Sequence, residues 1–404
     1  MTSRLRIGSL WGIPFFVDYT WFPAALLLVL SYGVLTAVGL FLSLLAHELA
    51  HSLVARAYGV RVSSITLFIF GGMAAIEREV PRPLGAFCVA VAGPLLSLGL
   101  FVLFSLARAW AVPESMLAST LASLAAINLT IALFNLLPGL PLDGGQMLKA
   151  AIWGWTGDRQ QGMIWAARAG QFVGFGLLGL GLLVVFVGSL NGLWLGLIGL
   201  FILNTARRYS QYAQLQQVLA RLKAADVMTR QFRVLDANMS LREFVDRYLV
   251  PSSLRPEAPT QPADVYFAEE DGRYRGLVRP ELLNDIERSQ WDRLTLKAIL
   301  KPMEQLQGVR EETPIPQVIQ MMRQAEPRRI LVFTPAGAIA GLIDRGDVVA
   351  MAARQLGVTL PQEVVQRVRD SQEWPPGFQV EDNLASEGSP SLSWPGSPDL
   401  RNEP

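Results

Sequence analysis

The charged residues of this chain are distributed so unevenly that they divide it into two kinds of sequence. Residues 1–206 carry 17 of the 69 Asp, Glu, Lys and Arg side chains, and residues 207–404 carry the other 52. An ordinary soluble domain has about 25% charged residues. The first half is therefore typical of a membrane protein and the second half of a soluble one. This pattern excludes a wholly soluble protein, a disordered chain and a fibrous chain.

Long apolar stretches in the first half predict helices that span a membrane. A helix needs about 20 predominantly apolar residues to cross the hydrocarbon core of a bilayer. The predicted fold class is a polytopic α-helical membrane protein with about six transmembrane helices, followed by a soluble α/β module. The predicted spans are approximately 19–33, 35–57, 84–107, 116–137, 169–188 and 191–207.

Arginine and lysine predict the orientation of these spans, because cytoplasmic loops carry an excess of both. Basic residues precede the first span, lie between the second and third and between the fourth and fifth, and follow the sixth. The alternate loops contain only Arg108. We therefore expect both termini, and with them the soluble module, in the cytoplasm.

The loop between the second and third spans has a pattern of its own. Val60, Val62, Ile65, Leu67 and Ile69 are apolar and partly alternating, and a Phe-Gly-Gly segment follows them. Alternation of this kind predicts a β-hairpin or a re-entrant segment near the membrane interface. An ordinary interfacial loop is the alternative.

The second predicted span carries the pattern His-Glu-x-x-His at His47, Glu48 and His51. The chain has two histidines, and both belong to this pattern. Residues four apart lie on one helix face, so both imidazoles can reach a single tetrahedral Zn²⁺. Glu48 can then act as a general base towards the attacking water. The alternative is a pair of histidines that only packs helices. A carboxylate in lipid costs roughly 2.5–3.5 kcal/mol, which argues against that alternative.

A catalytic zinc needs a third protein ligand and an open position. The chain has no further histidine and a single cysteine, so the third ligand must be a carboxylate. Asp143 is the candidate, because it follows the predicted cytoplasmic end of the fourth span at a depth compatible with His51. Glu77 and Glu79 are weaker alternatives. An ordinary Asp-Gly turn is the non-functional interpretation of Asp143.

Four segments together resemble the site-two protease family of intramembrane zinc metalloproteases. They are His-Glu-Leu-Ala-His in an apolar span, the Phe-Gly-Gly segment, Gly93-Pro94 in the third span and Asn-Leu-Leu-Pro-Gly-Leu-Pro-Leu-Asp-Gly-Gly at 135–145. The resemblance covers about residues 1–210. It implies an intramembrane zinc endopeptidase that cuts membrane-anchored proteins within or near a transmembrane helix, as in regulated intramembrane proteolysis.

The resemblance also implies roles for individual residues. One Zn²⁺ per chain would be bound by His47, His51 and Asp143, with Glu48 as the catalytic acid/base. Asn135 would contact the substrate or the developing oxyanion, a role that suits a neutral amide donor.

Cleavage of a helical substrate requires the helix to unwind locally, because its peptide bonds are shielded by their own hydrogen bonds. We expect the edge formed by Phe70, Gly71 and Gly72 to pair with the unwound substrate by β-addition.

The second half contains an internal repeat of about 70 residues. Each copy has the order strand, helix, strand, strand and helix, and the copies begin near Ala225 and Leu296. The repeat resembles a tandem pair of CBS domains, a module that often binds adenine nucleotides between its halves. Asp347 matches the ribose-binding aspartate of that pattern, but Asp344 replaces the hydroxyl residue and would repel a phosphate. An adenine-nucleotide site and a structural or dimerising module are the two interpretations.

The predicted domains are a transmembrane metalloprotease domain at 1–210, a linker helix at 211–223, tandem CBS domains at 224–356 and a C-terminal extension at 357–404. The extension is rich in Pro, Ser, Gly and Glu, which predicts a largely disordered segment. We expect the cytoplasmic CBS domains to modulate proteolysis. The alternative function is a CBS-gated membrane transporter or channel.

The resemblance also suggests partners and a location. The expected substrates are single-span membrane proteins such as anti-sigma factors, and a homodimer could form through the CBS domains. The lipid bilayer is the expected surrounding, and the net charge of +1 gives no sign of a nucleic-acid partner. The expected location is the bacterial inner (plasma) membrane as a multi-pass protein, with the thylakoid membrane as an alternative.

Overall fold

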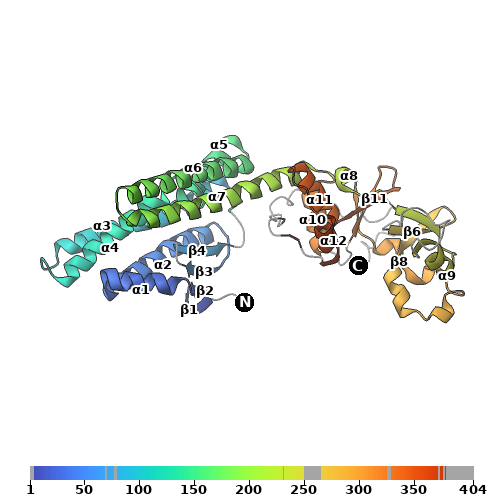
Figure 1. Cartoon of the computed structure of the whole chain (residues 1–404), viewed down its shortest axis with the longest axis horizontal. Helices are drawn as coiled ribbons and strands as arrows, with labels where there is room; N and C mark the ends of the chain where they lie inside the picture. Colours follow the sequence, from blue (N-terminus) through green and yellow to red (C-terminus); the bar gives the residue numbers. More distant parts are fainter. Residues whose placement is uncertain are drawn as a thin grey trace, which may run out of the picture. The chain divides into compact units, whose positions relative to one another are not determined.

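The structure is a computed structural model that describes residues 4–68, 71–76, 80–230, 232–249, 265–324, 329–371, 374–375 and 378. The chain divides into two compact units, Met1–Gln214 and Leu215–Pro404. The first is mainly helical and the second contains two small sheets (Figure 1). Phe70, the alternative ligands Glu77 and Glu79, and residues 379–404 lie outside the described residues.

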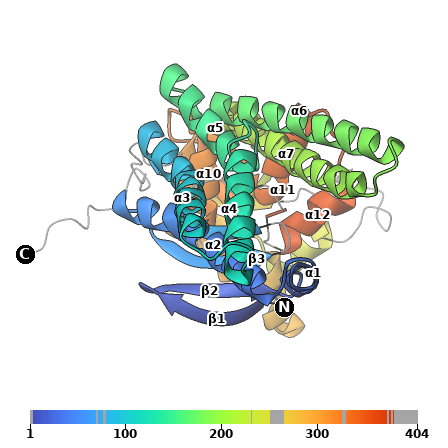
Figure 2. The ribbon, with the colours of Figure 1, turned by 90° about the vertical axis from the view of Figure 1, so that its left-hand side faces the viewer.

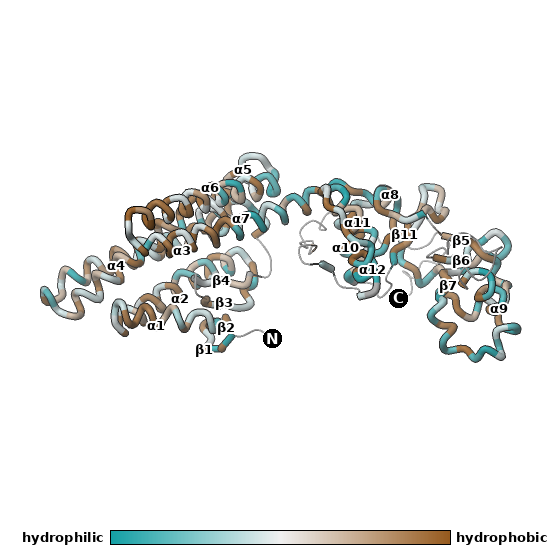
Figure 3. Tube along the Cα trace, in the orientation of Figure 1, coloured by the Kyte–Doolittle hydropathy of each residue, from teal (hydrophilic) through white to brown (hydrophobic). Residues whose placement is uncertain are grey.

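The first unit is built from long helices. Among the described residues, four helices are long and apolar enough to cross a membrane: α2, α3, α4 and α6. Hydrophobic residues dominate these helices (Figure 3), and α3 and α4 run side by side (Figure 2). The helices are α1 (Trp21–Tyr32), α2 (Val34–Ala57), α3 (Pro83–Ala109), α4 (Met116–Asn135), α5 (Asp143–Thr156), α6 (Arg159–Phe186) and α7 (Asn191–Arg221).

The helices differ from the predicted spans in length at three places. The predicted first span corresponds to α1, which has 12 residues and is short for a membrane crossing. The predicted fifth span, 169–188, starts ten residues too late, because α6 begins at Arg159 after the capping residue Asp158. The predicted sixth span and the predicted linker helix form one helix, α7, because residues 200–221 contain no glycine or proline that would end it.

A four-stranded sheet completes the first unit. The hairpin predicted in the loop at 59–83 is present as β3 (Val62–Phe68) and β4 (Gly71–Ile76). An N-terminal hairpin of β1 (Arg4–Leu10) and β2 (Ile13–Asp18) joins it, with β2 parallel to β3 and the order β1-β2-β3-β4. Buried side chains of β2 and β3 pack against Leu45 and Leu49 of α2. The sheet is thereby held against the helix that carries the predicted zinc ligands.

The second unit repeats one arrangement of strands. In the first copy β5 is parallel to β6, which forms an antiparallel hairpin with β7. In the second copy β9 is parallel to β10, which forms an antiparallel hairpin with β11. The strands are β5 (Phe232–Asp236), β6 (Val265–Glu270), β7 (Arg273–Val278), β8 (Leu300–Pro302), β9 (Gly308–Arg310), β10 (Arg329–Phe333) and β11 (Ile339–Asp344). The predicted internal repeat is therefore visible in the strand pairing.

Helices cover these sheets and continue into the C-terminal extension. They are α8 (Ala224–Val227), α9 (Leu241–Phe244), α10 (Ile315–Gln324), α11 (Arg345–Gln355) and α12 (Gln362–Ser371), together with short 3-10 segments. Helix α12 lies in the segment predicted to be largely disordered. It is ordered because Val368 is buried, and Trp374 and Phe378 beyond it pack against the core of the second copy.

Candidate active site

The predicted zinc ligands meet in the first unit. The Nε2 atoms of His47 and His51 lie 3.1 and 3.4 Å from the Oδ2 atom of Asp143, and 3.3 Å from each other. Both histidines project from α2 and are buried, whereas Asp143 is the first residue of α5. Residues 96 positions apart in the sequence are thus brought together.

The loop before Asp143 is held by close backbone packing. The Leu140 amide donates a hydrogen bond to the Ala166 carbonyl of α6, at 3.1 Å. A Cβ atom at Gly170 would lie 2.0 Å from the Leu140 oxygen, and one at Gly145 would lie 2.2 Å from the Leu140 nitrogen. Only glycine allows α5 and α6 to approach the loop this closely, and the approach fixes the position of Asp143.

Glu48 lies against the edge of the sheet. A Cβ atom at Gly72 of β4 would be 2.3 Å from Cγ and 2.8 Å from Oε1 of Glu48. The backbone of β4 therefore passes directly beside this carboxylate at Gly72, which offers no side chain there, whereas a Cβ atom at Gly71 would meet no other atom. Of the Phe-Gly-Gly segment predicted to bind substrate, the structure describes these two glycines.

Asn135 lies at the end of α4. It is the last residue of α4 and is half-buried, and the loop that carries Asp143 starts immediately after it. Asn135 thus lies at the start of the segment that leads to Asp143, while its role towards a substrate stays a prediction.

Several polar groups around the histidines were not anticipated from the sequence. Ser97 Oγ lies 2.9 Å from His47 Nδ1, and the Val89 carbonyl lies 2.7 Å from His51 Nδ1. The Asn128 amide donates to Ser43 Oγ one turn before His47, at 3.1 Å. A buried Ser or Asn in an apolar helix is the signal that could have directed attention to these positions.

Asp347 lies in the second unit and is hydrogen-bonded to other residues of the chain. Its amide donates to Asp344 Oδ1 and its Oδ2 accepts from the Asp344 amide, at 2.8 and 2.9 Å, so the two residues cap α11. Arg369 of α12 donates to Asp347 Oδ1 at 2.8 Å and also contacts Asp344. Burial, followed by the charge of Asp344, raises the pKa of Asp347 to about 6. Both carboxylate oxygens of Asp347 therefore have hydrogen-bond partners within the chain.

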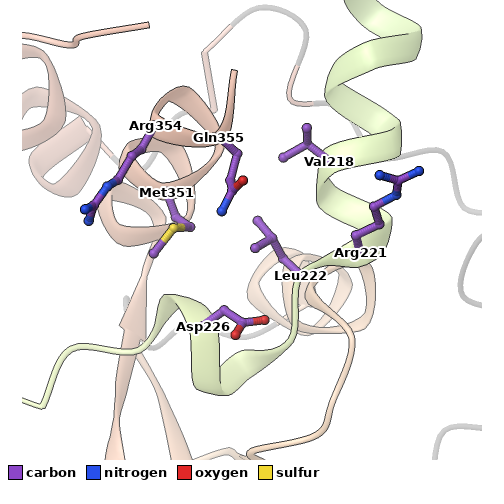
Figure 4. Close-up of a pocket in the computed structure, with 7 residues that line it drawn as sticks. All are labelled: Val218, Arg221, Leu222, Asp226, Met351, Arg354 and Gln355. Atoms are coloured by element: carbon purple, nitrogen blue, oxygen red, sulfur yellow. The ribbon is translucent and has the colours of Figure 1, made fainter. Parts of the chain in front are cut away.

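The second unit also contains a cavity of about 670 Å³ at the other end of α11. The guanidinium groups of Arg221 and Arg354 point away from its centre (Figure 4). The lining residues are Val218, Arg221, Leu222, Asp226, Met351, Arg354 and Gln355. Asp347, in the first turn of α11, is not among them.

Comparison with known proteins decides the family. The profile of Peptidase family M50 matches residues 35–114 and 103–178, and that of the CBS domain matches residues 297–354. The protein sll0528 of Synechocystis sp. is 33% identical over 368 residues, which cover 86% of this chain and 95% of that protein. This chain belongs to peptidase family M50. Rip3 of Mycobacterium tuberculosis is 36% identical over 331 residues, covering 81% of this chain and 82% of Rip3.

Both relatives of this M50 peptidase are named zinc metalloproteases. The solved site-2 protease of Methanocaldococcus jannaschii is 27% identical and covers 51% of this chain and 95% of that one, with a TM-score of 0.41. The family matches, the two named relatives and the four long apolar helices among the described residues show a multi-pass membrane zinc metalloprotease with a C-terminal CBS region.

The clustered residues of the M50 peptidase fit a zinc ion. Donor atoms of His47, His51 and Asp143 all lie within 4.8 Å of one another. Two imidazole nitrogens and one carboxylate oxygen are a donor set that zinc accepts, and three protein ligands leave a fourth position open for chemistry.

Proposed function

We propose that this M50 peptidase is an intramembrane endopeptidase that cuts membrane-anchored proteins within or near a transmembrane helix. The observation that carries the proposal is the cluster of His47, His51 and Asp143 on and beside the apolar helix α2, with Glu48 next to it. These three residues would hold the zinc. When bound, zinc polarises a carbonyl group and lowers the pKa of water towards neutrality.

Glu48 is the proposed general base. It takes a proton from the attacking water and delivers it to the leaving amine, which is the usual division of work for such a carboxylate. Its place beside the β4 backbone supports this role, because a peptide lying along β4 would pass next to the carboxylate. The Asn135 amide is the proposed hydrogen-bond donor to the oxyanion.

Substrate recognition is proposed at the edge of the sheet. Among the described strands, β4 pairs with β3 and ends the order β1-β2-β3-β4. An unwound substrate segment can add to such an edge through main-chain hydrogen bonds. Gly71 and Gly72 begin this edge, and the absence of a side chain at Gly72 leaves room beside Glu48. Phe70, outside the described residues, is the third residue of the predicted substrate-binding segment.

The proposed substrates are single-span membrane proteins such as anti-sigma factors. The proposed location is the bacterial inner membrane, with both termini in the cytoplasm, where the CBS domains modulate cleavage. Leu215, Leu219 and Leu222 at the end of α7 support that modulation, because they are buried in the core of the second CBS copy. Adenine-nucleotide binding at Asp347 and a homodimer through the CBS domains remain predictions.

The test is cleavage of a single-span reporter protein in liposomes by the wild type and by Glu48→Gln. The substitution keeps the shape of the side chain and removes the base, so cleavage should fall by about 10²–10⁴-fold. Zinc content, measured on the same samples, should stay unchanged because Glu48 is not a proposed ligand. Equal cleavage by the two proteins would contradict the proposal.

A further inference from the structure

One face of α3 contacts both histidines. Val89, Gly93 and Ser97 follow each other at intervals of four residues, so they form a single row along the helix. The Val89 carbonyl lies 2.7 Å from His51 Nδ1, and Ser97 Oγ lies 2.9 Å from His47 Nδ1. The two ends of the row, Val89 and Ser97, therefore meet the Nδ1 atoms of the rings, while Gly93 between them lies beside the Nε2 atoms, which also face Asp143.

We infer that this row is a positioning element that sets both imidazoles in the tautomer with hydrogen on Nδ1, with Ser97 as the positioning residue for His47. The inference rests on the proposed zinc role of the two histidines. A ring that donates through Nδ1 keeps the lone pair of Nε2 for a metal, and such partners commonly fix the orientation of metal-binding histidines.

The two partners differ in chemistry. A carbonyl only accepts hydrogen bonds, so Val89 obliges His51 Nδ1 to be the donor. The Ser97 hydroxyl can donate or accept, and it accepts from His47 once the Nε2 atom of that ring is committed to a metal. Ser97 is fully buried and His47 is only 3% exposed, so solvent does not compete for this hydrogen bond.

Gly93 sets the distance between the row and the rings. A Cβ atom at this position would lie 2.3 Å from His51 Nε2 and 2.5 Å from His47 Nε2. A side chain here would therefore push α3 away from the rings and lengthen the contacts of Val89 and Ser97. Glycine at position 93 allows all three contacts at once.

The experiment uses the fact that the chain has two histidines. The full-length protein is labelled with ¹⁵N-histidine, loaded with zinc in lipid and studied by solid-state NMR, so all imidazole signals come from His47 and His51. The expected spectrum shows both rings with a protonated Nδ1 and a zinc-bound Nε2. Ser97→Ala should shift the Nδ1 signal of one ring and leave the other in place.

Matched variants separate positioning from a general effect on α3. Ser97→Thr keeps the hydroxyl and should retain the wild-type spectrum. Ser105→Ala makes the same change two turns further along the helix and should change neither ring. In competition with a chelator, Ser97→Ala should bind zinc about 10–100-fold more weakly, and Ser105→Ala should bind it as the wild type does.

A zinc-bound Nδ1 on either ring of the wild type would overturn the inference, and this measurement does not depend on how any variant folds. The inference would also be overturned if Ser97→Ala shifted the Nδ1 signal of neither ring, or shifted both signals equally. The result is independent of proteolysis. A protein with the expected spectrum that fails to cut the reporter would refute the proposed function and leave the positioning role of α3 standing.

Discussion

The two units each hold carboxylates that are at least partly buried, but the groups that face these carboxylates differ between the units. In the first unit Asp143 faces the Nε2 atoms of His47 and His51 at 3.1 and 3.4 Å. Imidazoles can stay neutral and act as metal ligands. This cluster therefore offers three donor atoms and no permanent positive charge of its own.

In the second unit the chain supplies the positive charge itself. Arg369 contacts Asp344 at 3.1 Å and Asp347 at 2.8 Å, and a guanidinium is always protonated in proteins. The comparison indicates that the second cluster is complete, whereas the first is suited to a cation from outside. Sequence patterns alone made both look like ligand sites.

The largest expected effect is in the first unit. His47→Ala removes one of the three donors, so it should release the zinc and lower reporter cleavage by more than about 10³-fold. Metal analysis and cleavage are measured on one preparation. The control variant Asp344→Ala changes the cluster of the second unit, so the protein should keep its zinc. Full zinc occupancy in His47→Ala would break the distinction between the two clusters.

The next effect concerns the approach of β4 to Glu48. Gly72→Ala places a Cβ atom where only 2.3 Å separates it from Glu48 Cγ, so the carboxylate must move. Displacement of a reacting group by about 1 Å can cost about 10²-fold, and we expect a loss of that order in kcat with zinc retained. Met73→Ala, at an exposed neighbouring position of β4, is the control. Wild-type kcat in Gly72→Ala would contradict the proposed position of Glu48.

A smaller effect is expected at Arg369. Arg369→Ala removes the cation that contacts Asp344 and Asp347. We expect the local free energy of unfolding to fall by about 1–3 kcal/mol, a modest loss because Arg369 is partly exposed and solvent weakens its ion pairs. Hydrogen exchange of the full-length protein should become faster in α11 and α12. Arg367→Ala, on the same helix, serves as the control. Unchanged exchange would mean that the cluster does not depend on its internal cation.

The smallest effect is a pH dependence of the second unit. The pKa of Asp347 is raised from 3.8 to about 6 by burial and by Asp344, with Arg369 acting in the opposite sense. Between these values the folded state binds a proton that the unfolded state does not. The free energy of unfolding should therefore fall as the pH rises from about 4 to about 6, by about 1–2 kcal/mol. Denaturant titrations should show this slope, and Asp347→Asn should flatten it.

The sequence predicted the parts of the site that depend on local spacing. The pair His47 and His51 follows from helical periodicity, and Glu48 from its place between them. Asp143 followed from the absence of other donors together with the resemblance to a family. The internal repeat was recognisable because each copy has the same order of strands and turns.

Contacts between distant segments were not predictable in this way. The N-terminal hairpin joins β3 through parallel pairing of β2 with β3. The sequence of two short strands does not predict that they pair with each other. The approach of Ser97 to His47 depends on how α3 packs on α2. Arg369 lies in a segment whose composition predicts disorder, and its pairing with Asp347 depends on the docking of α12.

The central claim is that His47, His51 and Asp143 bind one zinc ion. Zinc K-edge X-ray absorption of the purified full-length protein tests it most directly. The claim predicts one zinc per chain, surrounded by nitrogen and oxygen at about 2.0–2.2 Å, with the scattering of two imidazoles. A sulfur ligand from Cys88, a single imidazole, or a spectrum that Asp143→Ala leaves unchanged would contradict it.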